Sequence, residues 1–180
     1  MSLQIVTANT SNAEDIATIG KKSFAQAFGD LFISKEDLQE YLAYTYNKEK
    51  LIASIQKENN IYFVALLNGT PVGFAKIKKH SLNEHIKCFA QMELQKLYVL
   101  FEYHGSGIGK ALMDKVILLA QKMQPDYLWL DTHVSNTNGI RFYEKNGFKK
   151  IAKHHFTIGT QTFEYHVMAL PVEVTETSLC

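Results

Sequence analysis

The most informative absences in this 180-residue sequence concern cysteine, charge of one sign and long apolar runs. Cys88 and Cys180 are its two cysteines, too few for the disulfide framework of a small secreted domain. Lys and Arg number 19 against 18 Asp and Glu, so the net charge of +1 gives no electrostatic reason to expect nucleic acid or an anionic membrane as a partner. No apolar run reaches the roughly 18 residues that a membrane helix needs. Residues 1–7 lack the basic and apolar segments of a signal peptide. We therefore expect a cytoplasmic protein with no nucleic-acid or membrane partner.

What the sequence does contain is the composition of a folded domain. Hydrophobic residues make up 46% and charged residues 21%, values that are typical of globular proteins. The length suits one domain with a substantial core. We expect residues 1–170 to form a single domain and residues 171–180 to form a C-terminal tail.

Hydrophobic periodicity predicts that strands and helices alternate along the chain. A strand over residues 3–8 precedes helical stripes over about 16–27 and 34–44, and the helical register continues over 48–57. Residues 61–67 are continuously apolar, as in a strand covered on both faces, and Asn68-Gly69 predicts a hairpin turn into a strand over 72–79. The remaining expected elements are a strand at 92–99, a helix at 108–123, a strand at 127–134, a helix at 136–146, and strands at 150–158 and 163–170.

The expected order of elements is β-α-α-β-β-β-α-β-α-β-β, which places the chain in the α/β class. Hairpin connections force antiparallel neighbours, whereas a crossover helix allows a parallel pair. The sequence therefore predicts a mixed, mostly antiparallel twisted sheet with helices on both faces.

Three glycines at alternate positions separate the 92–99 strand from the helix that follows it. Gly105, Gly107 and Gly109 leave backbone N–H groups uncovered at the positive end of a helix, which is a favourable place for phosphate. The spacing differs from that of a dinucleotide-binding loop, and the loop lacks the Gly-Lys-Ser/Thr ending of a nucleoside-triphosphate loop. A tight turn with close helix packing explains the glycines equally well, so the triplet alone does not decide between these interpretations.

Two motifs in a fixed order make the chain resemble the GCN5-related N-acetyltransferase (GNAT) superfamily. The first is Leu97-Tyr-Val followed by His104-Gly-Ser-Gly-Ile-Gly-Lys110, and the second is Asn136-x-x-Gly-Ile-x-Phe-Tyr143-x-x-x-Gly-Phe148. The similarity covers about residues 3–170 and is strongest over 92–148. The family usually has Gln or Arg where His104 stands and commonly Ala where Gly139 stands. A side-chain contact from His104 to the phosphates is therefore left open.

The resemblance implies acetyl-CoA as the co-substrate. We expect no metal, because His154-His155 lacks acidic or thiol partners at ligand spacing. The resemblance places the pantetheine arm along the main chain of Leu97, Tyr98 and Val99. It places the pyrophosphate on the amides of the loop formed by His104, Gly105, Ser106, Gly107, Ile108, Gly109 and Lys110. Elementary chemistry agrees, because a diphosphate suits a helix N-terminus and an amide-bearing arm suits an open strand edge. Asn136 would hydrogen-bond the arm near its thiol end, although an N-cap role explains this residue as well.

Tyr143 and Glu93 are the expected catalytic residues. The resemblance implies that Tyr143 contacts the cofactor and protonates the departing thiolate, which a phenol with a pKa near 10 can do for a thiol with a pKa of about 8.5. A core position beside Phe142 is the other interpretation of this tyrosine. The attacking amine must lose a proton, and Glu93 stands where histone-type members of the superfamily carry a base. Strand alternation puts Glu93 on the same side as Leu97. The alternative is an exposed carboxylate, with water chains acting as the base.

The fold does not fix the acceptor. Segments such as Leu38-Gln-Glu-Tyr-Leu42 and Val167-Met-Ala-Leu170 are similar to bacterial spermidine/spermine acetyltransferases, which implies a polyamine acceptor. A polycationic acceptor would need acidic residues at the entrance of its binding site, here called the acidic mouth. The acidic residues in the segments expected to form this entrance are Asp30, Glu36, Asp37, Glu40 and Glu84. The alternatives are acetylation of a protein N-terminus, a lysine or an aminoglycoside, or a non-catalytic CoA-binding sensor. The sequence leaves open whether the protein is a monomer or a homodimer.

Overall fold

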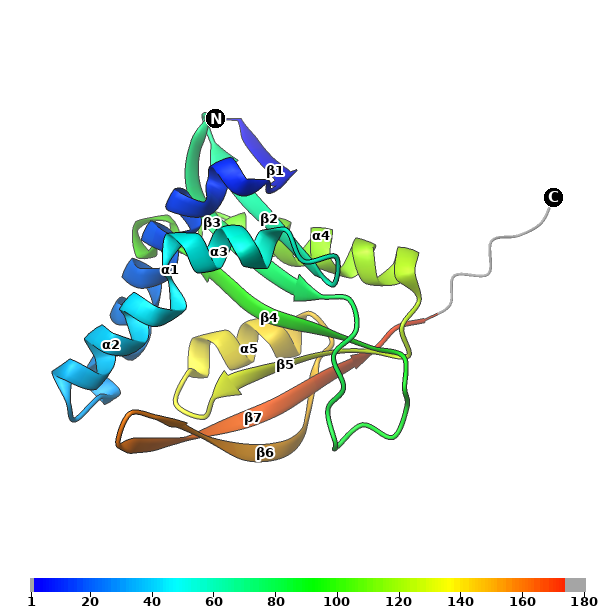
Figure 1. The fold of residues 1–180 in the computed structure, drawn as a ribbon. Coiled ribbons are helices and arrows are strands. Elements are labelled where there is room, and N and C mark those ends of the chain that lie inside the picture. The colour runs from blue at the N-terminus through cyan, green and yellow to red at the C-terminus, as the bar shows by residue number, and fades with distance from the viewer. Residues whose placement is uncertain (1, 174–180) are drawn as a thin grey trace.

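Seven strands form one open sheet in the computed structural model, which describes residues 2–173 (Figure 1). Their order is β1-β2-β3-β4-β5-β7-β6, and all neighbours are antiparallel except β4 and β5. The predicted mixed, mostly antiparallel sheet is therefore confirmed. The strands are β1 (Leu3–Thr7), β2 (Asn60–Leu67), β3 (Thr70–Lys78), β4 (Gln91–Val99), β5 (Tyr127–His133), β6 (Lys149–Ile158) and β7 (Gln161–Pro171).

Helices cover both faces of the sheet, as predicted. The helices are α1 (Ala13–Phe28), α2 (Lys35–Thr45), α3 (Lys48–Ile55), α4 (Ile108–Met123) and α5 (Thr137–Lys145). Helices α1, α2 and α3 pack over one face, in a core that includes Phe24 and Phe74. Helices α4 and α5 pack on the other face, in a core that includes Leu112 and Ile140. Figure 1 shows this division, with α1 and α3 in front of the sheet and α4 behind it.

The chain has three helices before β2, whereas the sequence predicts two. The helical register over 34–57 is interrupted because α2 ends at Thr45 and α3 begins at Lys48. Asn47 caps the new helix by accepting a hydrogen bond from the Lys50 amide at 2.9 Å. Tyr46, between the two helices, is completely buried. A capping asparagine beside a buried anchor therefore splits one periodic pattern into two helices.

Strand β4 positions the site because it is hydrogen-bonded to its parallel neighbour, β5, over only a short stretch. β4 pairs with β5 from Gln91 to Glu93 alone, and the two strands then diverge (Figure 1). Beyond Glu93, one edge of β4 has no strand partner among the described residues. The bare edge is where an added strand-like ligand can pair with the sheet.

A β-bulge at Gln95 changes which side chains of β4 share a face. Lys76 of β3 pairs with Lys96 and Ile77 pairs with Leu94, so Gln95 is the extra residue. Met92, Leu94 and Leu97 consequently pack against the α4 side of the sheet. The prediction that Glu93 and Leu97 share a side is wrong, because it assumes unbroken alternation. Glu93 instead lies on the same face as Lys96 and Tyr98.

Strand β7 ends at Pro171, inside the segment that we expected to form a tail. Residues 174–180 of that tail lie outside the described residues. Over residues 2–173, no helix has the length and apolar character needed to cross a membrane.

Gly20 of α1 offers a test of the packing between α1 and Tyr46. A Cβ at Gly20 would lie 2.1 Å from Cε1 of the Tyr46 ring. Ala is ordinarily favoured over Gly inside a helix by up to about 1 kcal/mol. Here we expect the clash to dominate, so that Gly20→Ala lowers the free energy of unfolding by about 1–3 kcal/mol in urea denaturation. Gly29→Ala is the matched control, because its Cβ would meet Leu38 at an ordinary 3.6 Å. Equal stabilisation in both variants would contradict this packing.

Candidate active site

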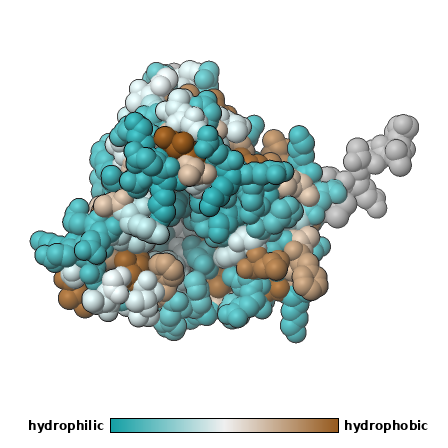
Figure 2. All heavy atoms as spheres, viewed as in Figure 1, coloured by the Kyte–Doolittle hydropathy of each residue, from teal (hydrophilic) through white to brown (hydrophobic). Residues whose placement is uncertain are grey.

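Two joined cavities lie where β4 and β5 diverge. The larger has a volume of about 750 Å³, within the range of roughly 300–1,000 Å³ that ligand pockets occupy. The smaller has a volume of about 270 Å³. The face viewed in Figure 1 is mostly hydrophilic and is hollowed near its centre (Figure 2). The residues that line both cavities, and so mark their junction, are Phe28, Leu97, Tyr98, Asn136 and Tyr143.

The glycine loop at the larger cavity has the backbone conformation of an anion site. Gly105 and Gly107 have φ angles of 78° and 86°, in the left-handed region that favours glycine. The first backbone hydrogen bond of α4 runs from the Ala111 amide to the Gly107 carbonyl at 3.0 Å, and no side chain caps the helix. The amides of residues 108–110 therefore have no hydrogen-bond partner among the described residues. A diphosphate would satisfy these donors and the helix dipole together.

Most of the predicted cofactor-binding residues line this larger cavity: Leu97, Tyr98, Val99, His104, Gly105, Gly107, Gly109, Lys110, Asn136 and Tyr143. Ser106 and Ile108 do not line it. The Ser106 hydroxyl donates to the Tyr103 carbonyl at 2.5 Å, and the Ile108 side chain is buried in the core. The Ser106 amide also donates to the Tyr103 carbonyl, at 3.3 Å, so of these two residues Ile108 is the one whose amide has no partner among the described residues.

The two basic side chains of the loop are already engaged within the protein. His104 places Nε2 2.9 Å from the Val99 carbonyl, and its ring lies 5.2 Å from that of Phe101. Lys110 pairs with Asp114 one helical turn further along α4. Both side chains would have to leave these contacts to reach a phosphate. The backbone of the loop is therefore the better-formed part of the anion site.

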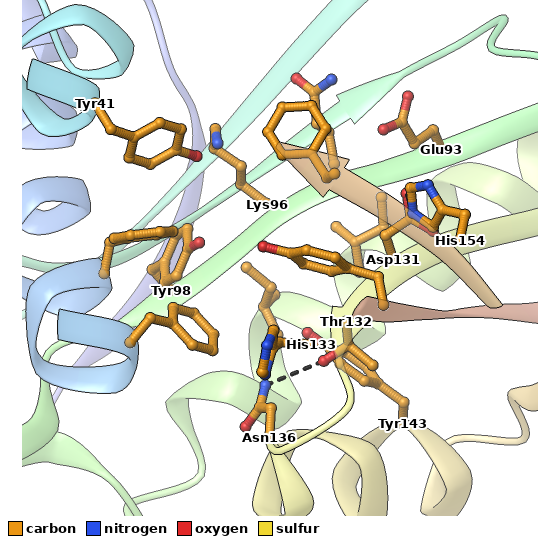
Figure 3. A pocket seen from close by; sticks show the side chains of 17 residues that line it. Tyr41, Glu93, Lys96, Tyr98, Asp131, Thr132, His133, Asn136, Tyr143 and His154 are labelled. Carbon is orange, nitrogen blue, oxygen red and sulfur yellow. Dashed lines mark hydrogen bonds and ion pairs between the residues drawn. The ribbon is translucent and has the colours of Figure 1, made fainter. Parts of the chain in front are cut away.

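Asn136 fulfils the N-cap role that the sequence allowed. Its Oδ1 accepts from the Gly139 amide at 3.1 Å, while Nδ2 donates to the Thr132 hydroxyl at 3.1 Å (Figure 3). A Cβ at Gly139 would lie 2.3 Å from Asn136 Nδ2. The glycine that departs from the family motif therefore makes room for this capping side chain. Nδ2 keeps a second hydrogen with which it can bind a ligand.

Tyr143 lies at the junction of the two cavities, on α5. Its ring packs against Phe142 and Phe148, with ring centroids 5.5 and 6.0 Å away. Phe148 is fully in the core, whereas Tyr143 is half-buried. Burial raises the pKa of Tyr143 to about 12, so the phenol stays protonated at neutral pH. It therefore holds its proton throughout the physiological range, while burial makes it a weaker acid than a free phenol.

Glu93 lies in the wall of the smaller cavity and is 8% exposed. Its Oε2 accepts from the Ser81 hydroxyl at 2.6 Å and forms an ion pair with Lys78 at 3.5 Å. The predicted base is therefore buried and held by two partners, and it is not the exposed strand carboxylate of the alternative interpretation.

Asp131 is a second carboxylate in the smaller cavity, and the sequence reasoning missed it. Its Oδ2 lies 3.0 Å from His154 Nε2, while Oδ1 is buried with no hydrogen-bond partner among the described residues. Burial is the main cause that raises the pKa of Asp131; His154 opposes the rise and the charge of Glu93 adds to it. In the sequence, the position of Asp131 was its one indication as a site residue: it is a carboxylate on the strand that precedes the Asn136 motif.

The acidic mouth predicted from other segments does not form at these cavities. Asp30, Glu36, Asp37, Glu40 and Glu84 line neither of them. Asp37 instead accepts hydrogen bonds from the Thr160 amide and hydroxyl at 2.8 and 2.7 Å, which tie α2 to the β6–β7 turn. The negative charge of the smaller cavity comes from Glu93 and Asp131. Across residues 2–173, no group of three or more His, Cys, Asp or Glu side chains is arranged to hold a metal ion.

The split sheet, the uncapped glycine-led helix and the paired cavities are the features expected of a transferase that binds an acyl-CoA beside an acceptor. Comparison with known proteins agrees. Residues 28–148 match the family model "Acetyltransferase (GNAT) family", and the chain belongs to that family. Members of this family transfer the acetyl group of acetyl-CoA to an amine, so the protein is an N-acetyltransferase with acetyl-CoA as its co-substrate.

Three relatives illustrate the range of similarity. A spermidine N(1)-acetyltransferase from Thermoplasma acidophilum is 26% identical over 83% of this chain and 89% of its own. The Escherichia coli [ribosomal protein bS18]-alanine N-acetyltransferase is 30% identical over 70% of this chain and 81% of its own. The crystal structure of the PaiA N-acetyltransferase from T. acidophilum with coenzyme A has a TM-score of 0.76 and 24% identity, and the match covers 95% and 99% of the two chains.

The loop geometry makes a matched pair of glycine substitutions informative. A Cβ at Gly107 meets nothing within 4 Å, so any effect of Gly107→Ala arises from its φ of 86°. A left-handed alanine costs about 1–2 kcal/mol, and the loop can escape this cost by moving its amides. We expect the Kd for CoA to rise about tenfold in isothermal titration, equivalent to about 1.4 kcal/mol. Gly109→Ala, at a helical position with Phe142 at 3.9 Å, should leave the Kd within about twofold. A larger loss in Gly109→Ala would contradict this account.

Proposed function

We propose that this enzyme transfers the acetyl group of acetyl-CoA directly to a primary amine that enters the smaller cavity. The observation that carries the proposal is the junction of the two cavities at Tyr143 and Asn136. A thioester carried along the bare edge of β4 would end at this junction, and an amine in the smaller cavity would face it. Because the two sites meet, transfer needs no covalent enzyme intermediate.

In this proposal the amine nitrogen forms a bond to the carbonyl carbon, and the carbon–sulfur bond breaks. Tyr143 gives its proton to the departing sulfur. Its pKa of about 12 keeps the proton available, and the nearby solvent-accessible cavity allows the phenol to be reprotonated. Asn136, held by its cap and by Thr132, orients the neighbouring end of the arm.

The proton lost by the amine goes to the carboxylates of the smaller cavity. Glu93 remains the base proposed from the sequence, but Ser81 and Lys78 already bind its Oε2. Asp131 has a buried oxygen without a hydrogen-bond partner among the described residues, and burial raises its pKa above that of a free carboxyl, which makes it a stronger base. We propose that Asp131 accepts the proton directly and that Glu93 assists through its charge or a bound water.

Two acceptor classes have support. A polyamine such as spermidine is the first, because a relative that covers most of the chain is named a spermidine acetyltransferase and because two carboxylates lie in the acceptor cavity. The α-amine of a protein or peptide is the second, because the 30%-identical relative is named for an alanine substrate on a ribosomal protein. An α-amine titrates near 8 and so needs less help to lose its proton than an alkylamine.

Tyr143→Phe tests both the reaction and the acid. We expect wild type to release thiol from acetyl-CoA with at least one amine in a panel of spermidine, spermine, alanine-starting peptides, lysine peptides and aminoglycosides. The variant should lose about 10²-fold or more in kcat, the contribution typical of a general acid. Its Kd for CoA should stay within about twofold, because the ring and its packing remain.

Phe142→Leu is the matched control, since the neighbouring ring lines the larger cavity without a proton to give. It should change the Kd for CoA more than kcat. If wild type binds CoA but releases thiol with no amine, the acetyl-transfer proposal is wrong and a CoA-sensing role replaces it.

The two carboxylates are separated by Asp131→Asn and Glu93→Gln. We expect Asp131→Asn to lower kcat by about 10²-fold, and Glu93→Gln to have the smaller effect. In wild type, kcat should fall as the pH drops through the raised pKa of Asp131, because the base works only when deprotonated. That acidic limb should vanish in Asp131→Asn. A limb that stays in Asp131→Asn and vanishes in Glu93→Gln would assign the base to Glu93.

A further inference from the structure

Lys96 is a cation in the acceptor cavity that the reaction described above does not use. It follows the bulge on β4, so its side chain shares a face with Glu93 and lines the smaller cavity. It is half-buried. No carboxylate among the described residues forms an ion pair with it, whereas the nearby Lys78 pairs with Glu93. Its ammonium lies 5.4 Å from the centre of the Tyr46 ring.

The charges of the cavity are divided between its two ends. Figure 3 shows Lys96 near the Tyr41 and Tyr98 side chains, while Glu93, Asp131 and His154 lie at the opposite end. Burial raises the pKa of Tyr41, so its hydroxyl is neutral. One end of the cavity therefore offers hydrogen-bond donors and a cation, and the other offers carboxylates.

The position of Lys96 is energetically unfavourable in the free protein. A half-buried ammonium without a paired anion loses hydration, which the contact with the Tyr46 ring replaces only in part. Accordingly, burial lowers the pKa of Lys96 to about 8, against the opposing effect of Glu93, and Lys50 lowers it further. The side chain still carries its charge in most molecules at pH 7. An acceptor oxygen placed beside it would supply the missing partner.

We propose that Lys96 determines acceptor specificity by binding a carbonyl or carboxylate oxygen of the acceptor and by repelling a second ammonium group. The amine of such an acceptor would lie at the Asp131 end, with its oxygen toward Lys96. A peptide with a free α-amine has this arrangement of groups, and a polyamine does not. The inference rests on the proposed acetyl transfer and favours the second of its two acceptor classes.

The test compares acceptor preference in wild type, Lys96→Met and Lys96→Arg. The kcat/KM for spermidine and for an alanine-starting peptide with uncharged side chains is measured at pH 7 by thiol release. We expect Lys96→Met to raise the spermidine-to-peptide ratio by about tenfold or more, because like charges no longer repel. Lys96→Arg should keep the wild-type ratio, since it restores the charge and the donor.

Lys76→Met is the matched control. Lys76 lies on β3, 5.6 Å from the Tyr62 ring, and burial lowers its pKa to about 8 as well, yet it does not line either cavity. Its removal should leave the ratio within about twofold. An unchanged ratio in an active Lys96→Met enzyme would overturn the role of Lys96 alone. Thiol release with no amine, even by wild type, would overturn the acetyl transfer on which this role rests.

Discussion

The separation of β4 from β5 after three paired residues is the constraint on which the site depends. Parallel strands normally stay hydrogen-bonded along their length, and a buried edge left without partners is costly. Here the freed edge of β4 faces a cavity and not the core, so a strand-like ligand can complete it. Because β4 and β5 diverge, α5 lies at the opening between them. Tyr143 and Asn136 are thereby brought to the junction of the two cavities.

The bulge at Gln95 is the second determinant, because it divides β4 into two functional halves. Before the bulge, Glu93 turns toward the smaller cavity while Met92 and Leu94 enter the core. After it, Leu97 and Val99 pack on the α4 side, and Lys96 and Tyr98 line the smaller cavity. One inserted residue thus places a carboxylate and an ammonium on the same wall of that cavity.

The anion site is formed by backbone conformation, with little help from side chains. Gly105 and Gly107 adopt left-handed φ angles, and α4 begins without a cap, so its first amides point at the larger cavity. His104 and Lys110 are engaged elsewhere in the loop and helix. A histidine is compatible with a position where the family usually has Gln or Arg, because the donors without a partner among the described residues are the amides of residues 108–110, whatever side chain stands at 104.

The sequence by itself determined the order of the strands, the mixed sheet, the glycine-led helix start and the cap at Asn136, because these follow from local periodicity, backbone freedom and short-range hydrogen bonds; the break between α2 and α3 was missed. It also indicated Tyr143, which a motif holds at a fixed spacing from Asn136. Tertiary structure alone decided which charged groups share the acceptor cavity. Asp131 and His154 come from different strands, and the five acidic residues expected at the mouth turned out to lie elsewhere. The face of Glu93 and Lys96 was likewise undetermined, since one bulge reverses strand alternation and the sequence carries no signal for where a strand gains a residue.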